Sequence, residues 1–136
     1  MIEVYGSPGK ESGDKQVFEA LKYLPKGWLA YAQPKIVHKT EERYPDYVLL
    51  HREYGYIVLE VKDWLQVENP YADGCYVISN LRPRPEKEKS PIEQARDAAQ
   101  LIHNKLVQVE ELRNFSGKLD FAYSYAGICL LYTSPS

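Results

Sequence analysis

Asp46, Glu60 and Lys62 form a set suited to metal-dependent chemistry. Asp46 follows Pro45, and Glu60 and Lys62 lie two positions apart at the end of an apolar run. Carboxylate oxygens are the ligands that Mg²⁺ and Mn²⁺ prefer, and such sites keep coordination positions for water and substrate phosphate. A bound ion lowers the pKa of its water and neutralises charge that develops on the phosphate. These residues therefore predict hydrolysis of phosphodiester bonds, with Lys62 orienting the attacking water.

A β-hairpin is the element that must position these side chains. Apolar, β-prone residues occupy 47–50 and 56–61, and the polar segment between them ends in a glycine. This pattern predicts two antiparallel strands with a short connection, in which Asp46 falls opposite Glu60 or Val61. The second strand is apolar on both faces, which is typical of a buried central strand.

A purely structural interpretation competes with the catalytic one. Glu60 and Lys62 share one face of the predicted strand, and two such residues often form only an ion pair. Charges on a buried strand are costly unless they are paired, bind a metal or lie at an open end. The Pro45-Asp46 pair at the matching place across the hairpin favours the metal site.

Two further polar side chains lie at the starts of predicted helices. Asp14 opens a helix over 14–24 and borders its buried stripe. There it serves equally well as a third metal-site acid or as a capping acid favoured by the helix dipole. Gln94 lies in the first turn of a helix predicted over 91–112, after a capping box that begins at Ser90.

The remaining segments complete an arrangement of helices and strands. We predict further strands at 28–37, 75–79 and 121–128, with loops at 40–44 and 81–89. The order helix, strand, hairpin, short strand, helix, strand predicts an α/β fold in which a mixed central β-sheet is flanked by helices.

Several of these segments together resemble the NERD (nuclease-related) domain of the PD-(D/E)xK nuclease superfamily. The resemblance rests on Pro45-Asp46, on the run from Gly55 to Trp64 that contains Glu60-Val61-Lys62, and on two helix starts. One start is Gly13-Asp14, where the family usually carries Glu in second place, and the other is the segment 90–95. The likeness extends from about Gly13 to Ile128 and implies a restriction-endonuclease-like core.

The resemblance also implies a substrate and a set of site residues. The expected metal ligands are Asp46, Glu60, Val61 and Asp14, and the expected catalytic residues are Asp46, Glu60, Lys62 and Gln94. The expected substrate is DNA, the expected cofactor is Mg²⁺ or Mn²⁺, and a helicase-like or other domain often follows such a domain in the same chain. The alternative is a DNA-binding or docking module that keeps the nuclease fold without cleaving.

Composition is that of one globular domain without a membrane span. The chain has 136 residues, of which 26% are charged, and its formal net charge is −2. A protein that coats DNA would show a basic excess, whereas acidic metal ligands are compatible with this balance. The sequence contains no apolar run of about 18 residues and no signal-peptide pattern at its start, so we expect a cytoplasmic protein.

Both ends of the chain are set apart from the expected domain at 13–128. Residues 1–12 are rich in glycine and charge, and they predict a flexible N-terminal arm. Residues 129–136 read CLLYTSPS, which resembles one translated frame of a common transposase sequencing adapter. We therefore expect this tail to derive from an adapter, and the natural protein to be longer and truncated here at its C-terminus.

Overall fold

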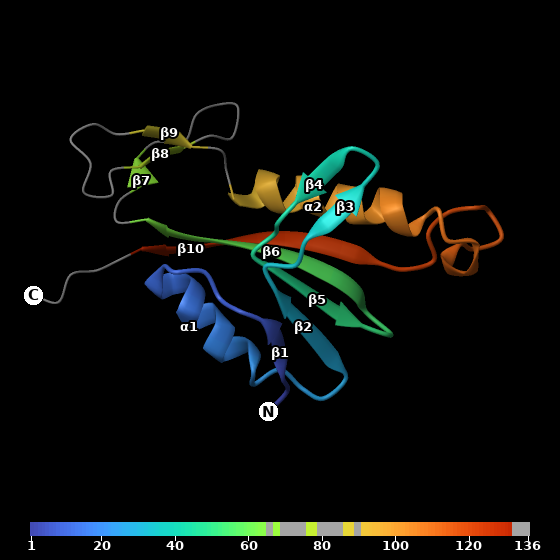
Figure 1. Cartoon of the computed structure of the whole chain (residues 1–136), viewed down its shortest axis with the longest axis horizontal. Helices are drawn as coiled ribbons and strands as arrows, with labels where there is room; N and C mark the ends of the chain where they lie inside the picture. The colour runs from blue at the N-terminus through green and yellow to red at the C-terminus, as the bar shows by residue number, and fades with distance from the viewer. Residues whose placement is uncertain (65–66, 69–75, 79–85, 89–90, 132–136) are drawn as a thin grey trace, which may run out of the picture.

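A five-stranded mixed sheet forms the centre of the protein, with a helix on each face (Figure 1). The structure is a computed structural model that describes residues 1–64, 67–68, 76–78, 86–88 and 91–131. In chain order its elements are β1 (Val4–Gly6), α1 (Ser12–Leu21), β2 (Trp28–Ala32), β3 (Ile36–His38), β4 (Glu41–Arg43), β5 (Tyr47–His51), β6 (Gly55–Trp64), β7 (Val67–Glu68), β8 (Tyr76–Ile78), β9 (Glu86–Glu88), α2 (Pro91–Leu106), the 3-10 helix η1 (Glu110–Leu112) and β10 (Tyr123–Leu131).

The strand order of the central sheet is β1-β2-β5-β6-β10. The pairing is parallel at both edges, between β1 and β2 and between β6 and β10. It is antiparallel from β2 through β5 to β6. Strands β7, β8 and β9 form a separate three-stranded sheet, and β3 and β4 a two-stranded one. This arrangement confirms the predicted α/β fold with a mixed central sheet.

The predicted hairpin of β5 and β6 lies at the centre of the main sheet. The two strands pair antiparallel, with Tyr47 opposite Leu59. Continued by one residue, this register sets Asp46 opposite Glu60, which is one of the two partners, Glu60 and Val61, that the sequence predicts. The connection ends at Gly55, whose φ of 87° lies in the left-handed region that favours glycine.

Strand β6 is buried on both faces, which confirms its predicted central place. One face packs with α1 and the other with α2. The buried residues of the α1 side are Val4, Val17, Leu21, Ala30, Ala32, Tyr47, Leu49 and Val61. Those of the α2 side are Val48, Tyr56, Val58, Ala95, Ala98, Ala99 and Ile102. Full burial of one large apolar side chain contributes about 1.5–3 kcal/mol, so the strand that carries Glu60 is anchored from both sides.

The N-terminal segment differs from the predicted flexible arm. Val4–Gly6 forms the edge strand β1, and Val4 is only 7% exposed. The Ile2 N–H also donates to the Lys22 carbonyl oxygen at 2.8 Å. The sequence does not reveal this strand, because three residues are too few for a recognisable alternating pattern and the rest of residues 1–12 is rich in glycine and charge.

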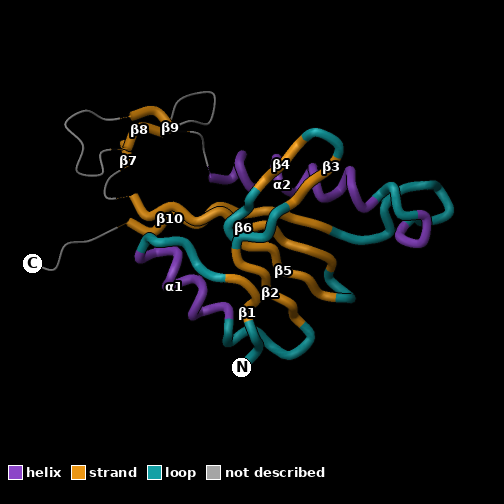
Figure 2. The backbone as a smooth tube through the Cα atoms, in the orientation of Figure 1, coloured by secondary structure: helices purple, strands orange, loops and turns teal. Residues whose placement is uncertain are grey.

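The β3–β4 hairpin is a second difference, since the sequence analysis divides it between a strand and a loop. Residues 36–38 pair with 41–43 as a sheet of their own. Gln33 and Lys39 adopt φ values of 50° and 56°, which few non-glycine residues do, so nothing in the sequence marks the turns. The hairpin lies beside α2 (Figure 2), where Lys105 Nζ donates to the Val37 carbonyl oxygen at 2.8 Å.

Several predicted boundaries also shift. The first helix spans Ser12–Leu21 rather than 14–24, and α2 ends at Leu106 rather than near Leu112. The last strand begins at Tyr123 and extends to Leu131, so its end pairs with Lys62–Trp64. Ser90 of the predicted capping box and most of the predicted loop at 81–89 lie outside the described residues. None of the helices in the described ranges is long and apolar enough to span a membrane.

Candidate active site

The Asp46 and Glu60 side chains meet beside the start of β5. The Asp46 N–H donates to Glu60 Oε1 at 3.3 Å, and the Val61 N–H donates to Asp46 Oδ2 at 2.7 Å. Each carboxylate therefore accepts a hydrogen bond from the backbone of the opposite segment. Pro45 is fully buried, and its ring restricts the direction in which the chain enters β5. Three of the expected site residues, Asp46, Glu60 and Val61, are thus brought together.

Burial and the neighbouring carboxylate raise the pKa of Glu60. Glu60 is only 7% exposed. Burial, then the charge of Asp46 and a hydrogen bond to its carboxyl, raise this pKa from 4.5 to about 8, while the charge of Lys62 lowers it. A buried carboxyl beside a second carboxylate holds its proton near neutral pH. A divalent cation can replace that proton, so the donor set fits Mg²⁺ or Mn²⁺.

This pKa predicts how the stability of the metal-free protein depends on pH. Unfolded Glu60 loses its proton near pH 4.5, whereas folded Glu60 keeps it to about pH 8. The proton therefore favours the folded state, and this contribution is lost as pH rises through that window. Glu60→Gln imitates the protonated acid at every pH. As pH rises from 5 to 8.5, we expect its free energy of unfolding to increase relative to that of the wild type by on the order of 3 kcal/mol.

Urea unfolding in EDTA at several pH values measures this difference. Glu53→Gln, which removes a negative charge from an exposed residue of the same hairpin, is the matched control. A Glu60→Gln effect that stays constant from pH 5 to pH 8.5 would contradict the prediction. Added Mg²⁺ should reverse the order of stability at pH 8.5, because only the wild type keeps both carboxylates.

Asp14 is placed differently from its expected role as a metal ligand. Its carboxylate accepts the Tyr47 hydroxyl at 2.5 Å and the Gly9 N–H at 3.0 Å. Across the residues whose side chains the structure describes, no three Asp, Glu, His or Cys side chains group to hold a metal ion. Asp14 therefore does not join the carboxylate pair as a third ligand in this structure. Its phenol partner is 33 positions away, beyond the reach of local sequence patterns.

Lys62 and Gln94 lie on different elements, β6 and α2. Lys62 is half-buried on β6, and its charge acts on Glu60. Gln94 is half-buried in the first turn of α2. The start of this helix lies against β10 at Gly127, the residue that pairs with Glu60, and a Cβ there would lie 2.9 Å from the Ile92 nitrogen. The sequence analysis missed Gly127, although a glycine inside a strand often marks a close backbone approach.

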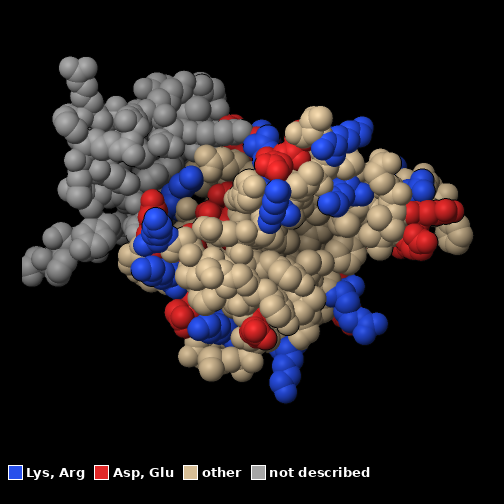
Figure 3. Space-filling model, in the orientation of Figure 1, with Lys and Arg blue, Asp and Glu red and all other residues tan. Residues whose placement is uncertain are grey.

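On the face seen in Figure 3, the charged side chains of the described residues do not gather into one basic patch. Figure 3 shows Lys and Arg along several margins of the face in view, interspersed with Asp and Glu. This distribution agrees with the formal net charge of −2. On this face, contact with a polyanion would depend on local Lys and Arg side chains rather than on a broad positive field.

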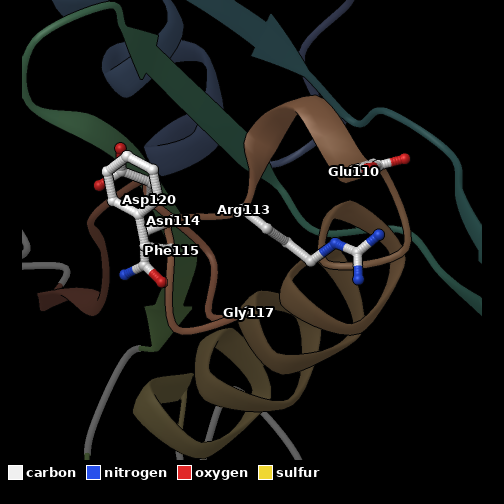
Figure 4. A pocket seen from close by; sticks show the side chains of 6 residues that line it. All are labelled: Glu110, Arg113, Asn114, Phe115, Gly117 and Asp120. Atoms are coloured by element: carbon white, nitrogen blue, oxygen red, sulfur yellow. The ribbon is translucent and has the colours of Figure 1, made fainter.

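A pocket of about 500 Å³ lies away from the carboxylate pair, in the segment between α2 and β10. Its lining residues are Glu110, Arg113, Asn114, Phe115, Gly117 and Asp120. Figure 4 shows the Arg113 guanidinium directed away from Asn114, Phe115 and Asp120, so the polar groups do not converge on one point. None of the expected site residues lines it, and we assign it no part in the chemistry.

Comparison with known proteins gives one match. Residues 9–123 match the family described as the nuclease-related domain, NERD. The matched segment contains Asp14, Asp46, Glu60, Lys62 and Gln94. No significant match was found among curated proteins or among solved structures.

Proposed function

Because the chain belongs to the nuclease-related domain family, we propose that it is a divalent-metal-dependent nuclease that hydrolyses DNA phosphodiester bonds. The observation that carries this proposal is the contact between the half-buried Asp46 and the buried Glu60, whose pKa is raised to about 8. Strongly perturbed acids of this kind cluster at functional sites. The pair weakens the metal-free fold above pH 4.5, so a purely structural purpose would be better served by uncharged residues.

Each residue of the proposed site has its own role in the reaction. Asp46 and Glu60, with the backbone of Val61, would hold Mg²⁺ or Mn²⁺. When bound, the ion supplies a water of lowered pKa and neutralises charge on the phosphate. Lys62, on the same face of β6 as Glu60, donates a hydrogen bond to the attacking water and opposes the negative charge that grows on the phosphate oxygens. Gln94 offers an amide to the water or to the substrate from the first turn of α2.

A DNA-binding or docking module that keeps the nuclease fold without cleaving is the second candidate. The interspersed charges give it little support, because non-specific affinity for DNA comes mainly from Lys and Arg that neutralise phosphates. Such a module does not require the metal-binding chemistry that we propose for the carboxylate pair. Under the favoured proposal the protein acts in DNA processing in the cytoplasm, beside a helicase-like or other partner domain.

Cleavage of DNA in the presence and absence of metal tests the proposal. Supercoiled plasmid and single-stranded DNA are incubated with the protein in Mg²⁺, in Mn²⁺ and in EDTA. We expect cleavage with either ion and none in EDTA, since both proposed ligands are acidic oxygens. Folded protein that binds either DNA without cutting it would instead support the docking module, and cutting that persists in EDTA would contradict the metal requirement.

A further inference from the structure

A hydrogen-bonded contact joins the start of α1 to the residue next to Asp46. Tyr47 is 0% exposed and Asp14 is 8% exposed. The Tyr47 hydroxyl donates to Asp14 Oδ1 at 2.5 Å and lies 2.8 Å from the Asp14 carbonyl oxygen. The Gly9 N–H donates to Asp14 Oδ2 at 3.0 Å. Both oxygens of this buried carboxylate therefore already have donors, and rotation toward the Asp46–Glu60 pair would break both hydrogen bonds.

Two neighbouring segments converge on the same place. The Gln33 N–H donates to the Asp46 carbonyl oxygen at 2.7 Å, from a residue whose φ is 50°. A Cβ on Gly9 would lie 2.2 Å from Asp14 Oδ2 and 2.9 Å from Gln33 Nε2. The loop before α1, the start of α1 and the turn after β2 thus all pack around the Asp46-Tyr47 peptide.

Asp46 needs such support because it precedes the first residue of β5. The regular β5–β6 ladder begins at Tyr47, so it does not fix the backbone dihedral angles of Asp46. Its carboxylate nevertheless accepts the Val61 N–H at 2.7 Å. Tyr47, held at its hydroxyl by Asp14 and along its ring by the core, fixes the peptide from which the Asp46 side chain projects.

We propose that Asp14 and Tyr47 form a latch that holds the Asp46 carboxylate in place, so that both are positioning residues and Asp14 is not a metal ligand. The metal-related part of this inference rests on the proposed function, in which Asp46 binds the ion. Residues that hydrogen-bond to a metal ligand and orient it typically change metal affinity by about 10–100-fold when they are removed. The Asp14–Tyr47 latch acts one peptide away from Asp46, so we expect the lower end of that range.

The test compares Tyr47→Phe and Asp14→Asn with a matched control, Tyr56→Phe. Tyr56 is also a buried tyrosine of the sheet, 1% exposed, and its hydroxyl donates to the Ala99 carbonyl oxygen at 3.0 Å on the α2 side. The first measurement is hydrogen exchange of the Val61 amide by NMR in metal-free protein, since this amide reports directly on the Asp46 carboxylate. The second is the Mn²⁺ dissociation constant at a temperature at which every variant is folded.

We expect Tyr47→Phe and Asp14→Asn each to speed Val61 exchange by about tenfold and to weaken Mn²⁺ binding by about tenfold. The double variant should be no worse than either single variant, because both remove the same contact. Tyr56→Phe should lose stability without either effect. Gly9→Ala, which displaces the Asp14 carboxylate without changing its charge, should reproduce the Tyr47→Phe result.

Two results would overturn the latch. One is unchanged Val61 exchange in both Tyr47→Phe and Asp14→Asn. The other is a large loss of Mn²⁺ affinity in Asp14→Asn with none in Tyr47→Phe, which would make Asp14 a direct ligand. The exchange experiment uses neither metal nor DNA. A protein that shows the exchange changes but never cleaves DNA would therefore keep the latch and lose the nuclease proposal.

Discussion

Lys62→Ala is expected to reduce metal-dependent DNA cleavage by about 10³-fold while leaving the protein folded. The estimate follows from the loss of one group that both orients the attacking water and stabilises developing charge, effects that each contribute roughly 10²–10⁴ in rate. Lys62 is half-buried beside Glu60, and its charge lowers the pKa of that residue. Its removal should therefore also weaken Mg²⁺ binding, because Glu60 will hold its proton more tightly.

Single-turnover cleavage at saturating Mg²⁺ separates these two effects. At saturation the loss that remains belongs to water and phosphate rather than to binding of the ion. Lys26→Ala, which removes an exposed lysine in the connection between α1 and β2, is the matched control and should cleave as the wild type does. A loss of less than about tenfold in Lys62→Ala at saturating metal would exclude Lys62 from the reaction.

Gly55→Ala is expected to destabilise the fold by more than about 3 kcal/mol, which exceeds the loss that most single substitutions cause. Two costs combine at this residue. Its φ of 87° is unfavourable for any side chain, and an added Cβ would lie 1.7 Å from the Ala122 carbonyl oxygen. That oxygen accepts the Tyr56 N–H at 3.0 Å, so the clash cannot be relieved without opening the junction of β6 and β10.

Gly117→Ala isolates the backbone cost. Gly117 has a φ of 78°, but nothing lies within 4 Å of an added Cβ. Its replacement should cost about 1 kcal/mol, which is the penalty of the left-handed conformation alone. Denaturant unfolding of both variants gives the comparison. Equal losses in the free energy of unfolding would show that the close approach of Ala122 to Gly55 does not contribute to the cost of Gly55→Ala.

The hairpin that carries the site could be predicted because its pattern is local. Two apolar runs and a glycine-terminated connection determine the register to within one residue, which places Asp46 opposite Glu60 or Val61. The burial that raises the pKa of Glu60 could not be predicted in the same way. This burial depends on α1, α2 and β10. Their packing is determined by the three-dimensional fit of side chains rather than by the spacing of residues along the sequence.

The features that the sequence analysis missed are short or distant in sequence. β1 has three residues and one buried side chain, so it leaves no periodic pattern. The sequence is equally compatible with Asp14 as a metal ligand and as a capping acid. It does not reveal the hydrogen bond from Tyr47, because that residue is 33 positions away. Gly127 is visible as a glycine, but only the packing of Pro91 and Ile92 against it explains why a side chain is excluded there.

The parallel pairing of β6 with β10 also dictates an order of events during folding. The Asp46–Glu60 contact spans 14 positions and can form as soon as its own hairpin closes. β6 gains its second neighbour only when residues 123–131 pair with 56–64, after the crossover through α2. Contacts so far apart in sequence form slowly. During synthesis the Asp46–Glu60 contact can therefore form before β10 is made, and the burial of Glu60 is completed only when α2 and β10 pack beside β6. A protein assembled in this order acquires the raised pKa of Glu60 only when its central sheet is complete.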